Sequence, residues 1–423
     1  MDQAEASLEA IKAAGVNVMP GSEDDGWEAP SPVTLDDGTI VQLFKDGEAL
    51  HAAYGAIESA KRRVCLEFYI FASDETGRAF ADLLCRKASE GLKVFVIYDS
   101  FGSIGSDSQM FRQMRRAGVR LEEFNPMAPW KCRFGWRPVN RDHRKLLIID
   151  DEIAGLGGLN VGHQYAGSWV ISPSSITGSS AGPAKEGSGC DFWRDNAIGL
   201  KGPAARYLLR SFAKTWHYVT HGGRIRNAAF NYNLEIIDRP TGGDDMGILA
   251  SVPTLDSPLR DTLRKLLSGA KESIQMTMAY FAPDDDLIEA LCSAAQRGVK
   301  VQLMLPAVCD VRLLLVAARS FYERLLTAGV EIYERQTVVL HAKTMTIDGR
   351  LTVIGSTNLD YRSIEYNLEL SAIVRSEEFG RDMQELFAND MHFAKRITLK
   401  QWRRRPRSDR IVQWAVSRAR YLL

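Results

Sequence analysis

The stretch HRKLLIID, residues 143–150, is written a second time as HAKTMTID, residues 341–348. Each copy carries a histidine, a lysine two positions later and an aspartate at its end. Side chains two positions apart on a β-strand share a face, so each histidine is predicted to project beside its lysine. The alternate residues Leu146 and Ile148 are predicted to point into a core. A chain that repeats so sparse a pattern is predicted to contain two similar halves.

Helices and strands are predicted to alternate in the same order around both copies. One helical pattern ends at Gly91 before the apolar run LKVFVIYD, and its counterpart ends at Gly298 before VKVQLMLP. This alternation predicts an α/β fold in which each half is a mostly parallel sheet covered by helices. The halves are predicted to be related by a pseudo-twofold axis, so that equivalent sites face each other.

The repeat and the composition of its flanks divide the chain. We predict a lead-in at 1–30, a first domain at 31–238, a second domain at 247–400 and a basic amphipathic tail at 401–423. The stretch 172–190 is rich in Ser and Gly and predicts a loop inserted in the first domain.

Composition excludes several classes of protein. The 423 residues are 45% apolar, and 53 Lys plus Arg balance 53 Asp plus Glu, so no nucleic-acid partner is expected from overall charge. Six cysteines without CxxC spacing predict neither a disulfide framework nor a zinc site. We predict no signal peptide and no transmembrane segment, because the N-terminus is acidic and no apolar window reaches about 20 residues.

The residues around each histidine favour an anionic ligand. GGLN (157–160) and GSTN (355–358) follow the two histidines at equal distances. Facing halves would therefore gather two imidazoles, two ammonium groups and two amides, which suits the negative charge of a phosphodiester transition state. The predicted phosphate ligands are Lys145, Asn160, Lys343 and Asn358.

Two histidines are sufficient for the chemistry. One neutral imidazole can attack phosphorus, and the other can pass a proton to the leaving alkoxide and later take one from the acceptor. No metal or other cofactor is predicted, because a lysine beside each histidine repels cations. A single HxK pattern is usually a surface feature, but two copies at equal spacing favour catalysis. The predicted catalytic set is His143, Lys145, Asp150, His341, Lys343 and Asp348.

The two motifs, HxKxxxxD followed by GSxN or a close variant, resemble those of the phospholipase D superfamily. The chain is most similar to bacterial cardiolipin synthases, over about residues 38–405, and the lack of predicted spans resembles the shorter B-type enzymes. The similar stretches are LEFYIF (66–71), RDHRKLLIIDDEIAGLGGLNVG (141–162), FWRDNAIGLKGPA (192–204), SFYERLLTAGVEIYE (320–334) and HAKTMTIDGRLTVIGSTNLDYRSIEYNLE (341–369).

The resemblance implies roles for individual residues. It implies that His143 is the nucleophile and His341 the general acid and base. It also implies that Asp195 in WRDN and Glu369 in YNLE orient the imidazoles. By the same resemblance, the aspartates that end the two motifs brace the chain more often than they touch substrate.

The implied reaction is phosphatidyl transfer between two phosphatidylglycerol molecules, giving cardiolipin and glycerol through a phosphohistidine. Hydrolysis to phosphatidic acid by the same site is the main alternative. A metal-independent nuclease and a non-enzymatic anion-binding scaffold are the others. The chain departs from the family at GHQYAG (162–167), where an acidic GDEY-type stretch is usual.

The tail from residue 400 onward carries eight basic residues and one acidic residue. It predicts either an amphipathic helix on an anionic membrane or a helix packed on the body of the enzyme. With the resemblance, this predicts peripheral attachment to the cytoplasmic side of a bacterial cell membrane. The sequence leaves the oligomeric state open.

Overall fold

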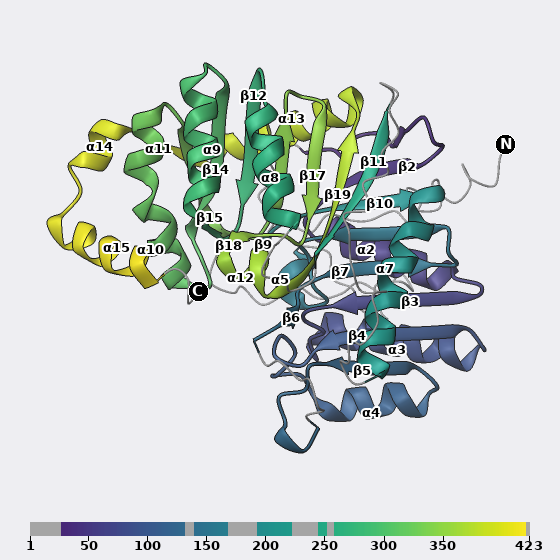
Figure 1. Cartoon of the computed structure of the whole chain (residues 1–423). Coiled ribbons are helices and arrows are strands. Elements are labelled where there is room, and N and C mark those ends of the chain that lie inside the picture. The colour runs from purple at the N-terminus through teal and green to yellow at the C-terminus, as the bar shows by residue number, and fades with distance from the viewer. Residues whose placement is uncertain (1–26, 132–138, 168–192, 222–243, 252–257, 420–423) are drawn as a thin grey trace.

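The computed structural model describes residues 27–131, 139–167, 193–221, 244–251 and 258–419. Three parts of the chain lie outside the described residues: most of the predicted lead-in, the Ser- and Gly-rich loop at 172–190, and residues 222–243, which precede the second sheet. Two sheets with their helices meet at a junction near the middle of the molecule (Figure 1).

The first half contains an eight-stranded sheet. In spatial order its strands are β1 (Val33–Thr34), β2 (Ile40–Lys45), β10 (Asn196–Lys201), β8 (Ile153–Gly157), β7 (Lys145–Ile149), β3 (Arg63–Phe68), β4 (Lys93–Asp99) and β5 (Arg120–Phe124).

The sheet of the second half repeats this order. Its strands are β11 (Asp245–Ser251), β19 (Asn367–Arg375), β17 (Leu351–Gly355), β16 (Lys343–Ile347), β12 (Ser273–Met278), β14 (Lys300–Val308), β15 (Glu331–Leu340) and β20 (Ala394–Ile397). From β11 to β15 each strand takes the place of one strand from β2 to β5. The α/β class and the duplication are therefore confirmed.

The prediction of mostly parallel sheets is wrong. Only β3–β4–β5 and β12–β14–β15 pair in parallel along these two orders, and the other neighbours are antiparallel. The turn after each motif accounts for one antiparallel pair in each sheet, β7–β8 and β16–β17. Asp150 and Asp151 both adopt positive φ (52° and 67°), as do Asp348 and Gly349 (51° and 62°). Two such residues make a tight hairpin, which returns the chain antiparallel.

Helices cover the two sheets. In the first half they are α2 (Glu48–Ser59), α3 (Glu75–Ser89), α4 (Ser108–Arg116), α5 (His163–Ala166) and α7 (Pro203–Thr220), with the short 3-10 helix η1 (Pro129–Lys131). In the second half they are α8 (Pro258–Gly269), α9 (Asp285–Gln296), α10 (Arg312–Ser320), α11 (Tyr322–Ala328), α12 (Tyr361–Glu365), α13 (Glu377–His392), α14 (Leu399–Arg403) and α15 (Arg407–Ala419).

Equivalent helices begin in the same way in both halves. The Asp74 carboxylate accepts from the backbone N–H of Gly77 at the start of α3, and Asp284 accepts from Leu287 at the start of α9. Such caps satisfy N–H groups that the helix itself leaves unpaired.

The halves exchange short strands at their junction. β6 (Arg141–Asp142) pairs with the start of β19, and β9 (Trp193–Arg194) pairs with the end of β15. Two further short strands, β13 (Phe281–Ala282) and β18 (Leu359–Asp360), pair with each other. The exchange is reciprocal: the residues just before His143 pair with those before Glu369, and the residues just before Asp195 pair with those before His341. This reciprocity is what a pseudo-twofold relation requires.

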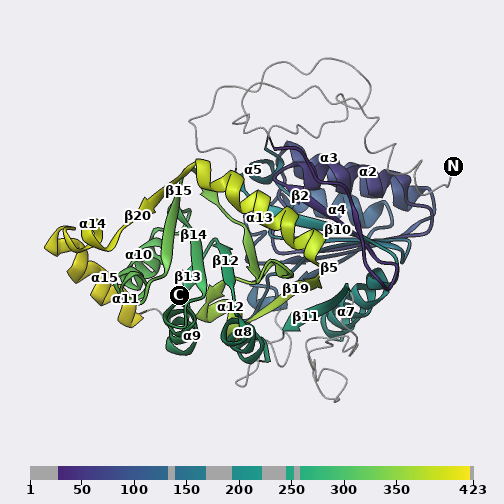
Figure 2. The same cartoon turned by 90° about the horizontal axis from the view of Figure 1, so that it is seen from above.

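The halves also share a hydrophobic core. Leu146 and Ile148 are fully buried and belong to one cluster with Leu370 and Ala372 of the second half, as their alternation predicted. Helix α13 lies along the junction in Figure 2, and its Asp390 makes a bidentate ion pair with Arg194 at 2.8 and 2.9 Å.

The described part of the tail packs on the second half. The Trp402 ring lies 4.8 Å from that of Tyr322, and α15 contacts α10. Gln413 is buried and Val416 packs against Ala317, whereas Ile411 and Trp414 are exposed. One face of α15 therefore packs on the body of the second half, and the other face is exposed. Within the described residues, no helix has the length and apolarity needed to cross a bilayer.

Candidate active site

The exchange of short strands brings the two predicted histidines to the junction. The His143 backbone N–H donates to the Leu368 carbonyl at 3.0 Å, and the His341 N–H donates to the Arg194 carbonyl at 2.8 Å. Burial is the main cause of the lowered pKa of His341, and the charges of Lys343, Lys145 and His143 add to it. The two copies of the motif thus form one site.

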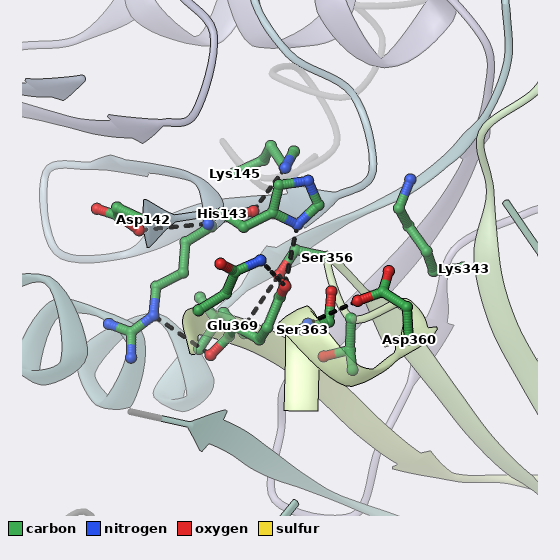
Figure 3. Close-up of polar contacts among 12 residues, drawn as sticks. Asp142, His143, Lys145, Lys343, Ser356, Asp360, Ser363 and Glu369 are labelled. Atoms are coloured by element: carbon green, nitrogen blue, oxygen red, sulfur yellow. Dashed lines mark hydrogen bonds and ion pairs between the residues drawn. The ribbon is translucent and has the colours of Figure 1, made fainter. Parts of the chain in front are cut away.

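Each histidine is held by a carboxylate from the opposite half. Nδ1 of His143 lies 3.1 Å from both carboxylate oxygens of Glu369, and Nδ1 of His341 lies 2.6 Å from Oδ2 of Asp195. Figure 3 shows the first of these contacts. Because Nδ1 is occupied in both rings, Nε2 is the free nitrogen of each. Sequence reasoning selected both carboxylates but did not predict that they cross between halves.

The two lysines are buried beside their histidines. The Lys145 ammonium donates to the His143 carbonyl at 2.5 Å, and the Lys343 ammonium donates to the His341 carbonyl. Lys343 Nζ also lies 2.9 Å from Nδ1 of His341. Charges of one half influence the lysine of the other, since both Lys343 and Glu369 affect the pKa of Lys145. The predicted histidine and lysine residues are therefore brought together.

Aromatic side chains that the sequence analysis missed surround the imidazoles. Tyr69 lies 5.1 Å from the His143 ring, and Tyr280 lies 6.1 Å from the His341 ring. Trp193 and Tyr165 also contact the His341 ring, at 5.0 and 5.5 Å between centroids. Both tyrosines follow equivalent buried strands, β3 and β12, but Tyr280 is aligned with Ile70 and not with Tyr69, so alignment of the halves does not reveal them as a pair.

The unusual GHQYAG stretch (162–167) supplies one of these aromatic side chains, Tyr165. It forms the short helix α5, whose His163 backbone N–H donates to Asp74 at 2.7 Å. The helix places Tyr165 against His341, and the Tyr165 hydroxyl accepts from Asn160 at 2.9 Å.

The surroundings of the two carboxylates differ. Ser356 Oγ donates to Glu369 at 2.5 Å, and Asn367 donates to the same carboxylate at 3.3 Å. Gly158 holds the position equivalent to Ser356, and a Cβ built there would lie 2.1 Å from Asp195 Oδ1. Asp195 instead accepts from the backbone N–H of Asn196 at 2.8 Å. A hydroxyl donor is present in one half and sterically excluded in the other.

Protonation follows from these contacts. Burial lowers the pKa of His143 to about 4, against the opposing effect of Glu369, and the imidazole is neutral near pH 7. Burial acts to raise the pKa of Glu369, but His143, Lys145 and the Ser356 hydroxyl bring it below its usual value. The first pair is therefore a neutral ring held by a carboxylate anion.

In the second pair, His341 and Asp195, the pKa of the carboxylate is raised and not lowered. Burial raises the pKa of Asp195 to about 6, although Lys343 opposes the shift. Burial and the neighbouring Lys343 bring the pKa of His341 well below its usual value. Burial also lowers the pKa of Lys145 to about 7 and of Lys343 to about 8. Two buried ammonium groups therefore face two buried carboxylates, and Lys145 is close to the point at which it loses its proton.

Asp150 and Asp348 lie away from the imidazoles, at the far ends of β7 and β16. The Asp150 carboxylate accepts from the backbone N–H groups of 61–63 at 2.7 to 2.8 Å. Asp348 does the same for 271–273 at 2.7 to 3.1 Å. Both carboxylates tie the hairpin turn to the preceding strand, which is the bracing role that the resemblance implied.

The two predicted amide ligands also differ. Asn160 donates to Tyr165 and accepts from the Ile70 backbone N–H at 3.0 Å, so its side chain is engaged within the protein. Asn358 is equally buried, but its amide oxygen has no hydrogen-bond partner among the described residues. Because this oxygen is an acceptor, a phosphate ligand would be bound by the amide NH2 of Asn358 and not by the oxygen. In the part of the chain that the structure describes, no group of three or more His, Cys, Asp or Glu side chains is arranged to hold a metal ion.

Comparison with known proteins assigns the family. The family model "Cardiolipin synthase, PLD-like domain" matches residues 54–168 and 263–391. A cardiolipin synthase of Geobacillus thermodenitrificans (strain NG80-2) is 32% identical over 389 residues, which is 92% of this chain and 72% of the relative. This chain belongs to the cardiolipin synthase, phospholipase D-like family. A probable cardiolipin synthase of Bacillus subtilis (strain 168) is 31% identical over 372 residues, 88% of this chain and 69% of the relative.

The fold has a solved counterpart. A crystal structure of phosphatidylserine synthase from Haemophilus influenzae Rd KW20 superposes with a TM-score of 0.65, covering 100% of both chains at 10% identity. This likeness concerns the fold alone. Each segment matched by the cardiolipin synthase model contains one HxK motif, which agrees with the duplication. The narrower expectation of a B-type enzyme stays a prediction.

Proposed function

We propose that this member of the cardiolipin synthase family transfers a phosphatidyl group between two phosphatidylglycerol molecules, giving cardiolipin and glycerol. The observation that carries the proposal is the pair of imidazoles, each fixed through Nδ1 by the opposite half's carboxylate. Such fixation leaves two Nε2 atoms at one junction, which suits a nucleophile and a proton carrier acting on one phosphodiester.

In the first step, Nε2 of His143 attacks the phosphorus of phosphatidylglycerol. The P–O bond to the head-group glycerol breaks, His341 gives the alkoxide a proton, and phosphatidyl-histidine remains. The neutral state of His143 supplies the lone pair for this attack. The negative charge of the bound phosphodiester raises the pKa of His341 and favours the protonated ring that the step needs.

In the second step, the free hydroxyl of another phosphatidylglycerol attacks the same phosphorus. His341 takes the hydroxyl proton, the P–N bond to His143 breaks, and cardiolipin is released. Lys145, Lys343 and Asn358 stabilise the charge on the non-bridging oxygens in both steps. Asp195 and Glu369 hold the rings, and Asp150 and Asp348 act only through the fold.

The test uses phosphatidylglycerol in mixed micelles, with separation of the lipid products. We expect cardiolipin and glycerol in equal amounts from the wild-type chain and none from His143→Ala. Phosphatidic acid as the main product would establish hydrolysis instead. Cleavage of plasmid DNA without added metal would favour a nuclease.

We also propose the finer organisation that the sequence suggested. The repeated strand order supports two domains, proposed at 31–238 and 247–400, although β11 of the second sheet begins at Asp245. Attachment is proposed to be peripheral, on the cytoplasmic side of a bacterial membrane, because the substrate is a membrane lipid. Fractionation of cells, with salt extraction of the membrane pellet, tests this attachment.

A further inference from the structure

Large apolar side chains are exposed around the junction on both sides. Among the described residues, those with more than a third of their surface exposed form two clusters, and Tyr366 of the α12–β19 connection is a further exposed residue of the second half. The first-half cluster is Phe101, Ile104, Met127, Trp130 and Val139, and the second-half cluster is Val308, Val311, Leu313, Ile411, Val412 and Trp414.

The first-half cluster is fixed to the active site through its backbone. Phe101 and Ile104 lie in the loop that follows β4, and Ser103 of that loop donates to the Tyr69 carbonyl at 3.3 Å. Tyr69 in turn contacts His143. The Arg141 guanidinium, two residues before His143, lies over the Phe101 ring at 5.8 Å. The loop that carries these apolar side chains is therefore linked to the first imidazole through Tyr69 and to β6 through Arg141.

The second-half cluster is fixed in the corresponding way. The Tyr280 hydroxyl donates to Asp310 at 2.7 to 2.9 Å, and Asp310 lies between the exposed Val308 and Val311. Tyr280 contacts the His341 ring. Helix α10 carries Leu313 and packs against both β13 and α15, so the open face of α15 continues the same cluster.

The open face of α15 combines apolar and cationic groups. Ile411 is 67% exposed and Trp414 is 59% exposed, and the Arg418 guanidinium lies 4.6 Å above the Trp414 ring. Arg407 and Arg410 are also exposed, against a single acidic residue, Asp409, in the helix. This combination suits the boundary of an anionic bilayer, where aromatic rings take the interface and arginines meet phosphate groups.

The two clusters flank the junction. In Figure 1, α10 and α15 lie on one side of β6, α12 and β18, and β4 and β5 lie on the other side. We propose that the two clusters together form a rim that seats the mouth of the site on an anionic phospholipid bilayer. This proposal rests on the proposed function, since acyl chains that remain in the bilayer require the site to approach its surface.

A bilayer fits these observations better than a protein partner. The exposed side chains project from separate loops and helices of both halves, and the cationic groups of α15 match a negatively charged surface. An apolar rim beside the two imidazoles would let the head-group phosphate reach His143 and His341 while the chains stay in hydrocarbon.

The experiment measures sedimentation of the full chain with vesicles of phosphatidylglycerol and phosphatidylcholine. We expect the pair Ile104→Ser and Trp130→Ser to weaken binding about tenfold, and the pair Ile411→Ser and Trp414→Ser to do the same. Pure phosphatidylcholine vesicles are expected to bind the wild-type chain more weakly, because they lack the negative charge.

The matched control is the pair Lys93→Ser and Lys300→Ser. These exposed lysines begin β4 and β14, at the strand ends opposite the two loops, and their removal is expected to change vesicle binding less than twofold. Wild-type binding by both rim variants, or equal loss in the control, would overturn the proposal. Loss of self-association in place of vesicle binding would assign the rim to a second copy and also overturn it.

A second assay separates this proposal from the proposed function. Short-chain phosphatidylglycerol below its micellar concentration needs no membrane, so the rim variants are expected to turn it over at the wild-type rate. If the wild-type chain formed no cardiolipin while vesicle binding still depended on the rim, the function would fail and the rim would stand. Thermal midpoints within a few degrees of wild type confirm that the variants fold.

Discussion

The two halves hold their histidines in equivalent backbone positions but beside different carboxylates, Glu369 for His143 and Asp195 for His341. Glu369 receives a hydroxyl hydrogen bond from Ser356 and has a lowered pKa, whereas Asp195 faces Gly158 and has a pKa raised to about 6. The first arrangement keeps an anion beside a neutral ring. In the second arrangement the carboxylate accepts a proton more readily, because burial raises its pKa. The two copies of the site therefore differ at the residue that faces the carboxylate, which is Ser356 in one half and Gly158 in the other.

The difference supports a division of labour between the imidazoles. A nucleophile needs a permanently neutral ring with a fixed tautomer, which the His143–Glu369 pair supplies. A general acid and base must gain and lose a proton in each cycle, which suits His341, whose partner carboxylate Asp195 has a pKa raised to about 6 and takes up a proton more readily than Glu369. The following predictions test that comparison.

The largest expected effect comes from removing the rings. His143→Ala is expected to reduce turnover by about 10⁴-fold or more, because no covalent intermediate can form. His341→Ala is expected to lose about 10²- to 10⁴-fold, the usual contribution of a general acid and base. Phosphorus-labelled phosphatidylglycerol should label the His341→Ala protein and not the His143→Ala protein. The opposite labelling pattern would reverse the two roles.

The next effect comes from the crossed carboxylates. Glu369→Gln and Asp195→Asn are each expected to slow turnover about a hundredfold, because an amide no longer fixes the tautomer of its imidazole. Glu369→Gln should slow labelling of His143, while Asp195→Asn should mainly slow the proton-transfer steps. Stopped-time labelling separates the two. Slower labelling only in Asp195→Asn would contradict the crossed arrangement.

Smaller effects are expected from the residues that make the carboxylates unequal. Ser356→Ala removes one hydrogen bond to a charged group and is expected to cost about tenfold in kcat. Gly158→Ala is expected to cost more, because its Cβ would lie 2.1 Å from Asp195 Oδ1 and must displace that carboxylate. Steady-state kinetics of both variants test this order. Equal activity of Gly158→Ala and the wild type would show that the close contact has no consequence.

The smallest expected effect is the pH dependence. Lys145 has a pKa of about 7 and Lys343 of about 8, so their positive charges are present below these values and lost as the pH rises through them. The rate at pH 8 is therefore expected to fall severalfold below that at pH 6. On the acid side, His143 becomes protonated as the pH falls through about 4, which removes the nucleophile. A profile of kcat/KM from pH 3.5 to 9 measures both limbs, and a rate still rising above pH 8 would contradict the role of the lysines.

Local patterns predicted much of this molecule. The helices that end near Gly91 and Gly298 and the buried alternation of Leu146 and Ile148 follow from periodicity, which acts over a few residues. Such patterns did not predict whether neighbouring strands run parallel or antiparallel, because this depends on which strands become neighbours. The hairpins after both motifs held the missing signal, in the residue pairs Asp150–Asp151 and Asp348–Gly349.

By itself the sequence determined the duplication, the repeated histidine and lysine motifs and, through the resemblance, the two carboxylates. Only the tertiary structure decided that Glu369 serves His143 and Asp195 serves His341, since these residues are 226 and 146 positions apart. It also decided that Asn160 is engaged with its own half while the amide oxygen of Asn358 is not. The physical reason is that hydrogen bonds across a junction depend on how two folded halves pack, and no local pattern records that packing.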